Sequence, residues 1–222
     1  MTTAEQQVEE QAEEQAAELL VFLRTSETKI QEVLLKHLKA NSTVCNQHLY
    51  IFAVARKALS QSFAFRQLID SRNGLVAGSL VRMQLDVILR AYALFWVDDP
   101  DDFAKRVIIN GEQIDRIKAS DGEQMKDRYL RKKIISEYPW VDSVYKKTSG
   151  YVHLSQLHLH GVFSKGDGEI SLHLGPYEQN VSLAHYGELL SIFLRMNMML
   201  EPILDDALLR IHGQCLADFV NK

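Results

Sequence analysis

The stretch GSLVRMQLDVILRAYALFW, residues 78–96, decides the fold of this chain. It is apolar on nearly every side, which predicts a helix at the centre of a bundle. The exceptions are Arg82, Asp86 and Arg90, whose spacing of four residues places them on one face of a helix. Three charges near the centre of a bilayer cost about 2.5–3.5 kcal/mol each, more than the apolar residues return, so we expect no membrane span.

Helical patterns continue on both sides of this stretch. The predicted helices cover residues 4–39, 43–70, 75–97, 101–119, 122–137, a short segment from Pro139 towards Tyr151, and 182–220, which Pro202 should kink or divide. Within residues 43–70 the expected core positions are Leu49, Phe52, Leu59, Phe63 and Leu68, and Ile51 and Val54 lie close enough to that face to widen it. Between the last two helices, GVFSKGDGEISLHLG has a Gly-Asp-Gly turn between alternating segments, which is typical of a β-hairpin. The predicted fold class is therefore all-α, a multi-helix bundle with one small inserted hairpin at about residues 156–175.

Composition and charge suggest how the chain is divided. The 222 residues are 46% hydrophobic and 24% charged, as in an ordinary globular protein, and only four are proline. Six glutamates and no basic residue lie in the first 20 positions. We therefore expect an acidic, solvated or frayed helical extension over residues 1–18 and a single domain over 19–222. The remainder is nearly neutral, which neither requires nor excludes a nucleic-acid partner.

Two cysteines, Cys45 and Cys215, stand far apart and outside any CxxC spacing. Isolated thiols in a chain of this length indicate a reducing compartment. The N-terminal segment lacks the basic and apolar regions of a secretory signal. We therefore expect a cytoplasmic protein.

Two interpretations of the charged stripe remain open. Asp86 could pair with both arginines in a buried structural ladder, whose disruption would cost about 3–5 kcal/mol. Alternatively, the stripe could line a cleft in which Asp86 orients Arg82 and Arg90, and the spare positive charge binds an anion. Arginine suits phosphate and carboxylate because its planar fork donates two parallel hydrogen bonds.

A second polar constellation occurs in YKKTSGYVHLSQLHLHG, residues 145–161. His153 follows a predicted helix end, with Tyr151 and Ser155 close by in sequence. A histidine beside hydroxyl groups could act as a general acid or base, because its pKa lies near neutrality. It could equally bind a backbone carbonyl at the helix end.

Metal chemistry is the weaker alternative. On strands of the predicted hairpin, His158 and His160 would share a face, with His173 across from His160, and three histidines can bind zinc. Solvated hairpin histidines are the commoner explanation, and no HExxH motif is present. We therefore expect neither a metal nor another cofactor.

Phosphate loops, dinucleotide loops and the nucleophile elbow GxSxG are absent from the sequence. The basic run RYLRKK, residues 128–133, is usually a solvated helix face, and it could also contact an RNA backbone.

The chain resembles a group of uncharacterised bacterial helical proteins related to the HEPN superfamily (higher eukaryotes and prokaryotes nucleotide-binding). The residues that carry the resemblance are Ser79, Arg82, Asp86, Arg90 and Trp96, followed by Tyr151, His153 and Ser155. The resemblance covers roughly residues 75–160, and Asp86 stands where glutamate is commoner. It implies a helical, often dimeric bundle used in RNA cleavage within toxin–antitoxin or anti-phage systems, or as a non-catalytic partner.

HEPN ribonucleases carry arginine, four to six residues, then histidine on one helix, and this chain has no such pair. The nearest approach is Lys147 with five residues before His153, interrupted by Gly150. The resemblance therefore predicts a homodimer that binds a nucleotide or an RNA phosphate through Arg82, Asp86, Arg90, Tyr151 and Ser155. If the protein cleaves RNA, it would do so without metal and with His153 as acid or base. The alternative is a non-catalytic interaction protein with a structural ladder, which meets a protein partner through its acidic N-terminus or its hairpin.

Overall fold

The computed structural model describes residues 3–40, 43–156, 158, 162–166, 169–173, 175 and 181–220. In chain order its elements are α1 (Thr3–Ala40), α2 (Asn46–Asp70), α3 (Gly74–Ala93), the 3-10 turn η1 (Leu94–Trp96), α4 (Pro100–Ile108), the 3-10 turn η2 (Ile114–Arg116), α5 (Asp127–Ile134), α6 (Trp140–Val152), β1 (Phe163–Gly166), β2 (Glu169–Leu172) and α8 (Leu183–Val220). The predicted all-α bundle with one small hairpin is confirmed.

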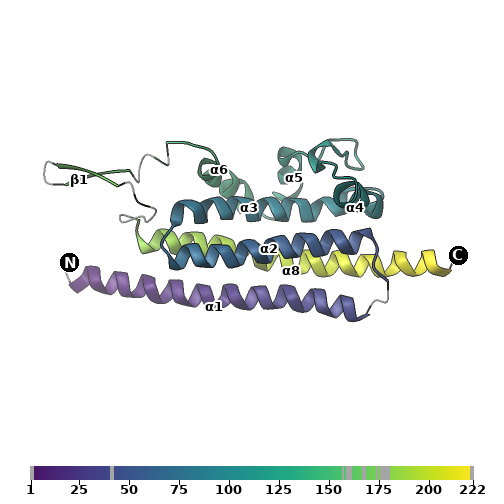
Figure 1. Ribbon diagram of the computed structural model, residues 1–222, viewed down its shortest axis with the longest axis horizontal. Coiled ribbons are helices and arrows are strands. Elements are labelled where there is room, and N and C mark those ends of the chain that lie inside the picture. The colour runs from purple at the N-terminus through teal and green to yellow at the C-terminus, as the bar shows by residue number, and fades with distance from the viewer. Residues whose placement is uncertain are drawn as a thin grey trace.

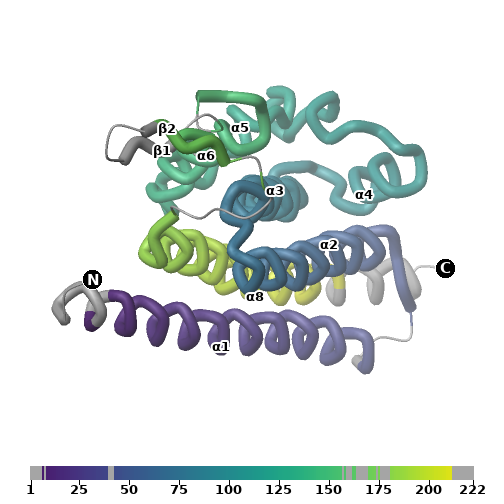
Figure 2. Tube along the Cα trace, turned by 60° about the vertical axis from the view of Figure 1, so that its left-hand side comes forward, coloured from purple at the N-terminus to yellow at the C-terminus, as the bar shows by residue number. Residues whose placement is uncertain are grey.

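The helices stack in layers, as Figures 1 and 2 show. α1 forms one outer layer, α2 and α8 form the next, and α3 lies between them and the cap of α4, α5 and α6. The central place predicted for residues 75–97 is confirmed, because Val81, Leu85, Ile88 and Leu89 of α3 are fully buried. Asn73 caps this helix by accepting a hydrogen bond from the backbone of Val76.

A buried polar network joins four helices. Asn197 of α8 accepts a hydrogen bond from Gln84 of α3 at 2.9 Å. The amide of Asn197 also donates to Ser26 of α1 and to Ser62 of α2, at 3.2 Å each. Ser62 in turn donates to Glu27 at 2.7 Å. Because these hydrogen bonds need specific atoms opposite one another, the network fixes how α1, α2, α3 and α8 are aligned.

The buried face of α2 agrees only in part with the predicted one. Phe52, Leu59 and Leu68 are half-buried and pack against the core, whereas Leu49 and Phe63 are 44% and 58% exposed. The polar Ser62 on the buried side donates to Glu27 of α1 and accepts from Asn197 of α8. At the start of α2, Asp101 of α4 accepts hydrogen bonds from the side chain of Asn46 and the backbone of Gln47. The face that α2 buries comprises Gln47, His48, Tyr50, Ile51, Val54, Ala55, Ala58, Gln61, Ser62, Phe65 and Ile69.

The two helices predicted over residues 101–119 and 122–137 are much shorter in the structure. α4 ends at Ile108, and Gly111 follows with a φ of +69°, a left-handed conformation that glycine adopts without strain. A loop containing η2 then leads to α5. The loop ends at Asp127, the first residue of α5.

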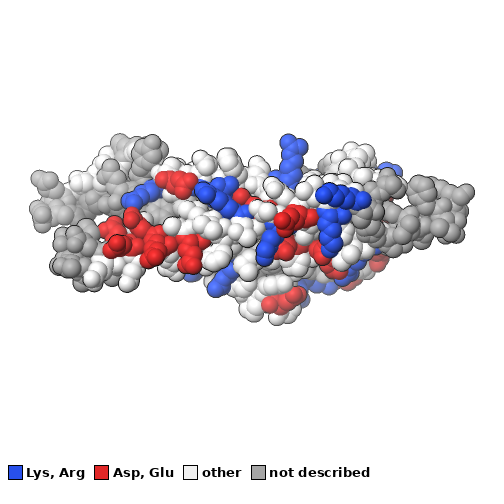
Figure 3. Space-filling view, turned by 90° about the horizontal axis from the view of Figure 1, so that it is seen from below, with Lys and Arg blue, Asp and Glu red and all other residues white. Residues whose placement is uncertain are grey.

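Two other predicted boundaries can be compared with the structure. α1 continues through residue 18 without a break, and α8 continues through Pro202 as one helix. The exposed glutamates Glu9, Glu10, Glu13, Glu14 and Glu18 lie on the N-terminal half of α1, where acidic side chains gather in Figure 3. Across the part of the chain that the structure describes, no helix is long and apolar enough to cross a membrane.

The hairpin projects from one end of the bundle (Figure 1). Its strands are antiparallel, with Phe163 opposite Leu172 and Lys165 opposite Ile170. Since strand residues alternate between faces, Phe163, Ile170 and Leu172 share one face. All three are more than half exposed, at 55%, 66% and 53%.

Candidate functional site

The charged stripe of α3 meets an aspartate that the sequence patterns did not single out. Arg82 and Arg90 each place an Nη2 atom 2.8 Å from a carboxylate oxygen of Asp127, the first residue of α5. Arg90 also pairs with Asp86 through Nη1, at 2.6 Å. Two acids therefore balance the two arginines, and the spare positive charge predicted within the stripe is taken up by Asp127.

Tyr145 of α6 completes this cluster. Its ring lies between two guanidinium groups, with the Cζ atoms of Arg82 and Arg131 at 4.0 Å and 3.8 Å from the ring centroid. Its hydroxyl donates to Asp127 at 3.1 Å. Arg131 is held in turn by Asp142 at 2.7 Å. The cluster thus ties α5 and α6 to the polar face of α3.

The two aspartates have pKa values that are shifted in opposite directions. Burial raises the pKa of Asp86, and Arg90 only partly offsets this effect. Burial would also raise the pKa of Asp127, but Arg90, Arg82 and the hydrogen bonds from Arg90 and Tyr145 together hold it below its ordinary value. Asp127 is therefore the fixed negative charge of the cluster, and Asp86 is the carboxyl group that accepts a proton more readily.

A cavity of about 340 Å³ opens beside the cluster. It is lined by Lys57 of α2, by Arg82, Met83 and Asp86 of α3, by Tyr145, Ser149 and Val152 of α6, and by His153. Arg82 and Asp86 therefore share a wall with His153, which lies 71 residues after Arg82 in the chain. Arg90 is not among the lining residues. It contacts the cluster through its ion pairs with Asp86 and Asp127.

His153 is the C-cap of α6, with an extended backbone and an exposed side chain. The predicted ligand-binding residues Tyr151 and Ser155 are not among the residues that line the cavity. Tyr151 accepts a hydrogen bond on its backbone oxygen from Ser79 of α3 at 2.8 Å. Ser155 donates to the backbone oxygen of Gly150 at 2.8 Å. Both residues fix the chain on either side of His153, so they position this histidine.

Close packing between Tyr151 and Gly78 predicts an unusual response to mutation. A Cβ atom on Gly78 would lie 2.5–2.7 Å from three atoms of the Tyr151 ring. Replacing Gly78 by alanine should therefore destabilise the protein by about 1–2 kcal/mol in urea unfolding, although alanine favours a helix. Made in a Tyr151→Ala background, the same change should be neutral or stabilising. An equal loss in both backgrounds would exclude the ring as the cause.

The weaker metal alternative, a site of His158, His160 and His173, finds no support in the two of these histidines that the structure describes. His158 lies before the hairpin and contacts Ser155 through Nδ1, while the backbone of His173 donates to Val162. His160 lies outside the described residues. Within the described residues, no group of three or more His, Cys, Asp or Glu side chains could hold a metal ion.

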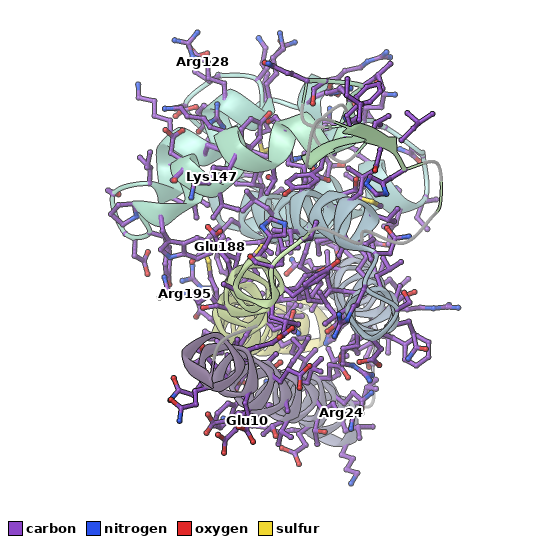
Figure 4. All side chains as sticks on the ribbon, turned by 90° about the vertical axis from the view of Figure 1, so that its left-hand side faces the viewer. Glu10, Arg24, Arg128, Lys147, Glu188 and Arg195 are labelled. Carbon is purple, nitrogen blue, oxygen red and sulfur yellow. The ribbon has the colours of Figure 1, made fainter. Side chains whose placement is uncertain are left out.

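The other basic candidates are largely engaged within the protein. Lys147 of α6 pairs with Glu188 of α8 at 3.2 Å, and Figure 4 shows the two side chains close together. In the run 128–133, Arg131 is stacked on Tyr145 and Lys133 pairs with Asp121 at 2.9 Å. Arg128, by contrast, is exposed and points away from the bundle (Figure 4).

The sequence patterns did not single out Asp127, Lys57 or Ser149, and they indicated Arg131 only as a member of the basic run 128–133. Asp127 carries a weak signal, since it is an acid directly before a run of basic residues. Lys57 carries none, because it is an ordinary exposed lysine until α2 is placed beside α3.

Comparison with known proteins adds no assignment: the chain matches no protein-family model, no curated protein and no solved structure.

Proposed function

We propose that the cavity beside Arg82 binds the phosphate of a nucleotide or of RNA, in a helical protein of HEPN-like type. The observation that carries the proposal is that Lys57, Arg82 and His153 line one cavity together with Ser149. Two permanent cations, a titratable imidazole and a hydroxyl are the groups that bind phosphate oxygens in proteins.

Arg82 keeps donors for a ligand although Asp127 holds it. A guanidinium group carries five N–H donors, and the hydrogen bond to Asp127 uses one on Nη2. Stacking on Tyr145 and the ion pair to Asp127 restrict the side chain to one orientation. A ligand therefore loses less conformational entropy on binding than it would with a freely rotating arginine.

Asp86 favours a nucleotide over a bare phosphate ion. Its carboxylate lies on the same wall as the cations and would repel a small dianion. A carboxylate does, however, accept hydrogen bonds from ribose hydroxyls or from an amino group. A volume of about 340 Å³ lies at the lower end of the range for small-molecule sites.

Cleavage of RNA is the enzymatic extension of this proposal. His153 would transfer the proton, and Arg82 would stabilise the charge that develops on phosphate. The HEPN pair of arginine and histidine is absent from the sequence, and Lys147, the nearest substitute, faces Glu188. We therefore propose binding as the function, and a bacterial homodimer as its setting by resemblance.

Lys57→Ala tests the proposal with the least damage to the fold, because Lys57 is exposed. Losing one charge-assisted hydrogen bond should weaken binding of AMP, or of a short RNA, by about 10- to 100-fold in calorimetry. Arg128→Ala is the matched control, since it removes an exposed cation outside the cavity. Equal losses in both variants, or no binding to the wild type, would contradict the proposal.

An interaction protein is the second candidate. The exposed apolar face of the hairpin, formed by Phe163, Ile170 and Leu172, favours it, as does the balanced charge of the arginine cluster. The calorimetry separates the two functions, because an interaction protein with a structural ladder binds no nucleotide.

A further inference from the structure

A second cavity, of about 420 Å³, lies at the other end of α3. We refer to it as the aromatic pocket, because Tyr92, Phe95, Trp96 and Tyr138 all line it. These four rings are half-buried, so their faces are only partly covered by the protein. The remaining walls come from the end of α5 and from α8. None of its lining residues belongs to the cavity beside Arg82.

The rings are arranged around Tyr92 at different angles. Phe95 and Tyr138 are inclined to Tyr92 by 60° and 57°, with centroids 6.0 Å and 6.5 Å away. Trp96 is nearly parallel to Tyr92, at 12°, but its centroid is only 5.8 Å away. A flat base sandwiched between two rings needs about 7 Å, two van der Waals separations, so this pair leaves no slot for one. Rings inclined to one another form an angled wall instead, which suits a rounded group better than a flat one.

The charged groups at the pocket favour a positive ligand. Arg210 is paired with Asp206 through two hydrogen bonds, of 2.8 Å and 3.2 Å. Lys133 is paired with Asp121 at 2.9 Å. Both cations of the wall are thus neutralised within the protein, whereas Glu137 is an exposed carboxylate on the same wall. A ligand in the pocket therefore meets aromatic rings and a carboxylate.

One ring already holds a cation. The guanidinium of Arg210 lies 4.6 Å from the centroid of Phe95. Burial raises the pKa of Tyr138, Tyr92 lowers it in part, and the neighbouring Glu137 raises it further. Glu137 and Tyr138 are adjacent in the chain and both line the pocket, so an acid and an aromatic ring border the same space.

We propose that the aromatic pocket binds a small organic ammonium ion, of the quaternary or methylated type, through Tyr92, Trp96, Tyr138 and Glu137. Aromatic faces attract such ions, and the attraction is strongest where water is excluded. The carboxylate adds a Coulombic contribution. The site is independent of the nucleotide cleft, and its test succeeds or fails separately.

Trp96 makes the test direct, because the chain has only two tryptophans. In a Trp140→Phe variant of the full-length protein, Trp96 is the only tryptophan and reports on the pocket. We expect choline to change its emission in a saturable way. We expect no such change with 3,3-dimethylbutanol, which has the same shape and no charge. Proton NMR of the choline methyl groups, which should shift upfield over ring faces, gives a second readout on the unmodified protein.

Glu137→Gln is the matched variant, because it keeps the shape of the side chain and removes the charge. It should weaken choline binding by about 5- to 30-fold, while Lys57→Ala, in the other cavity, should leave it unchanged. Equal responses to choline and to its neutral analogue would overturn the inference, because the pocket would then be merely apolar. An unsaturable response to choline, or an unchanged affinity in Glu137→Gln, would overturn it as well.

Discussion

Replacing Asn197 by alanine should destabilise the protein by about 3–4 kcal/mol, more than we expect for any residue of the arginine cluster. Asn197 is 1% exposed and binds residues on three other helices. Its loss removes three hydrogen bonds and leaves a small cavity. It also leaves Gln84 without its partner, and Gln84 is fully buried with an Oε1 atom that already lacks a hydrogen bond among the described residues.

Unfolding in urea measures this loss, and two further variants identify its cause. Met198→Ala changes the neighbouring residue, which is 60% exposed, and should cost less than about 0.5 kcal/mol. Asn197→Leu alone leaves the amide of Gln84 unpaired, whereas the double variant Gln84→Leu/Asn197→Leu removes both polar groups. The double variant should therefore be more stable than Asn197→Leu. If it is not, the network contributes little beyond packing.

Replacing Asp127 by asparagine should have the second-largest effect, a loss of about 2–3 kcal/mol at neutral pH. Breaking a fully buried ion pair costs about 3–5 kcal/mol, and the lower value allows for the 28% exposure of the Asp127 side chain. The amide removes the charge that faces both Arg82 and Arg90. Equilibrium unfolding in urea gives the measurement.

Asp86→Asn is the matched control, because it makes the same chemical change in the same cluster. Burial raises the pKa of Asp86, so its charged form is unfavourable in the fold, and we expect a loss below about 1 kcal/mol. Equal losses of stability in Asp86→Asn and Asp127→Asn would contradict the inference that Asp127, and not Asp86, is the fixed negative charge of the cluster.

The contributions of Asp127 and Asp86 to the free energy of unfolding should change with pH in opposite directions. The pKa of Asp127 is lowered in the folded state, so its contribution is complete above the unfolded value near 3.9 and is lost as pH falls through the folded value. The pKa of Asp86 is raised, so its contribution is present below the unfolded value and is lost as pH rises through the folded value. Asp127→Asn should therefore flatten the acid side of the stability curve.

Residues 78–96 show which features of a helix the apolar pattern of its sequence predicts and which it does not. Their apolar character correctly predicted a central helix, because a helix with apolar side chains on nearly every side must be covered on every side. The glutamine within this stretch gave no hint of its role. Gln84 is buried only because Asn197, which lies 113 residues further along the chain, supplies an acceptor.

α2 shows where the same reasoning fails. The apolar spacing predicted Leu49 and Phe63 as core positions together with Phe52, Leu59 and Leu68, and only the last three pack against the core. The structure buries a face with polar members such as Ser62, which donates to Glu27 of α1 and accepts from Asn197 of α8. Sequence periodicity cannot register a partner on another helix, so it undervalues such a face.

For the candidate site, the sequence by itself determined which charges share a face of α3 and that a histidine follows α6. Helical spacing is local, and it needs only the chain geometry. Only the tertiary structure decided that Asp127 neutralises both arginines, and that Lys57 and His153 line one cavity with Arg82. These pairings join α2, α3, α5 and α6, and packing between helices sets them. No spacing along the chain encodes the distance between side chains on different helices.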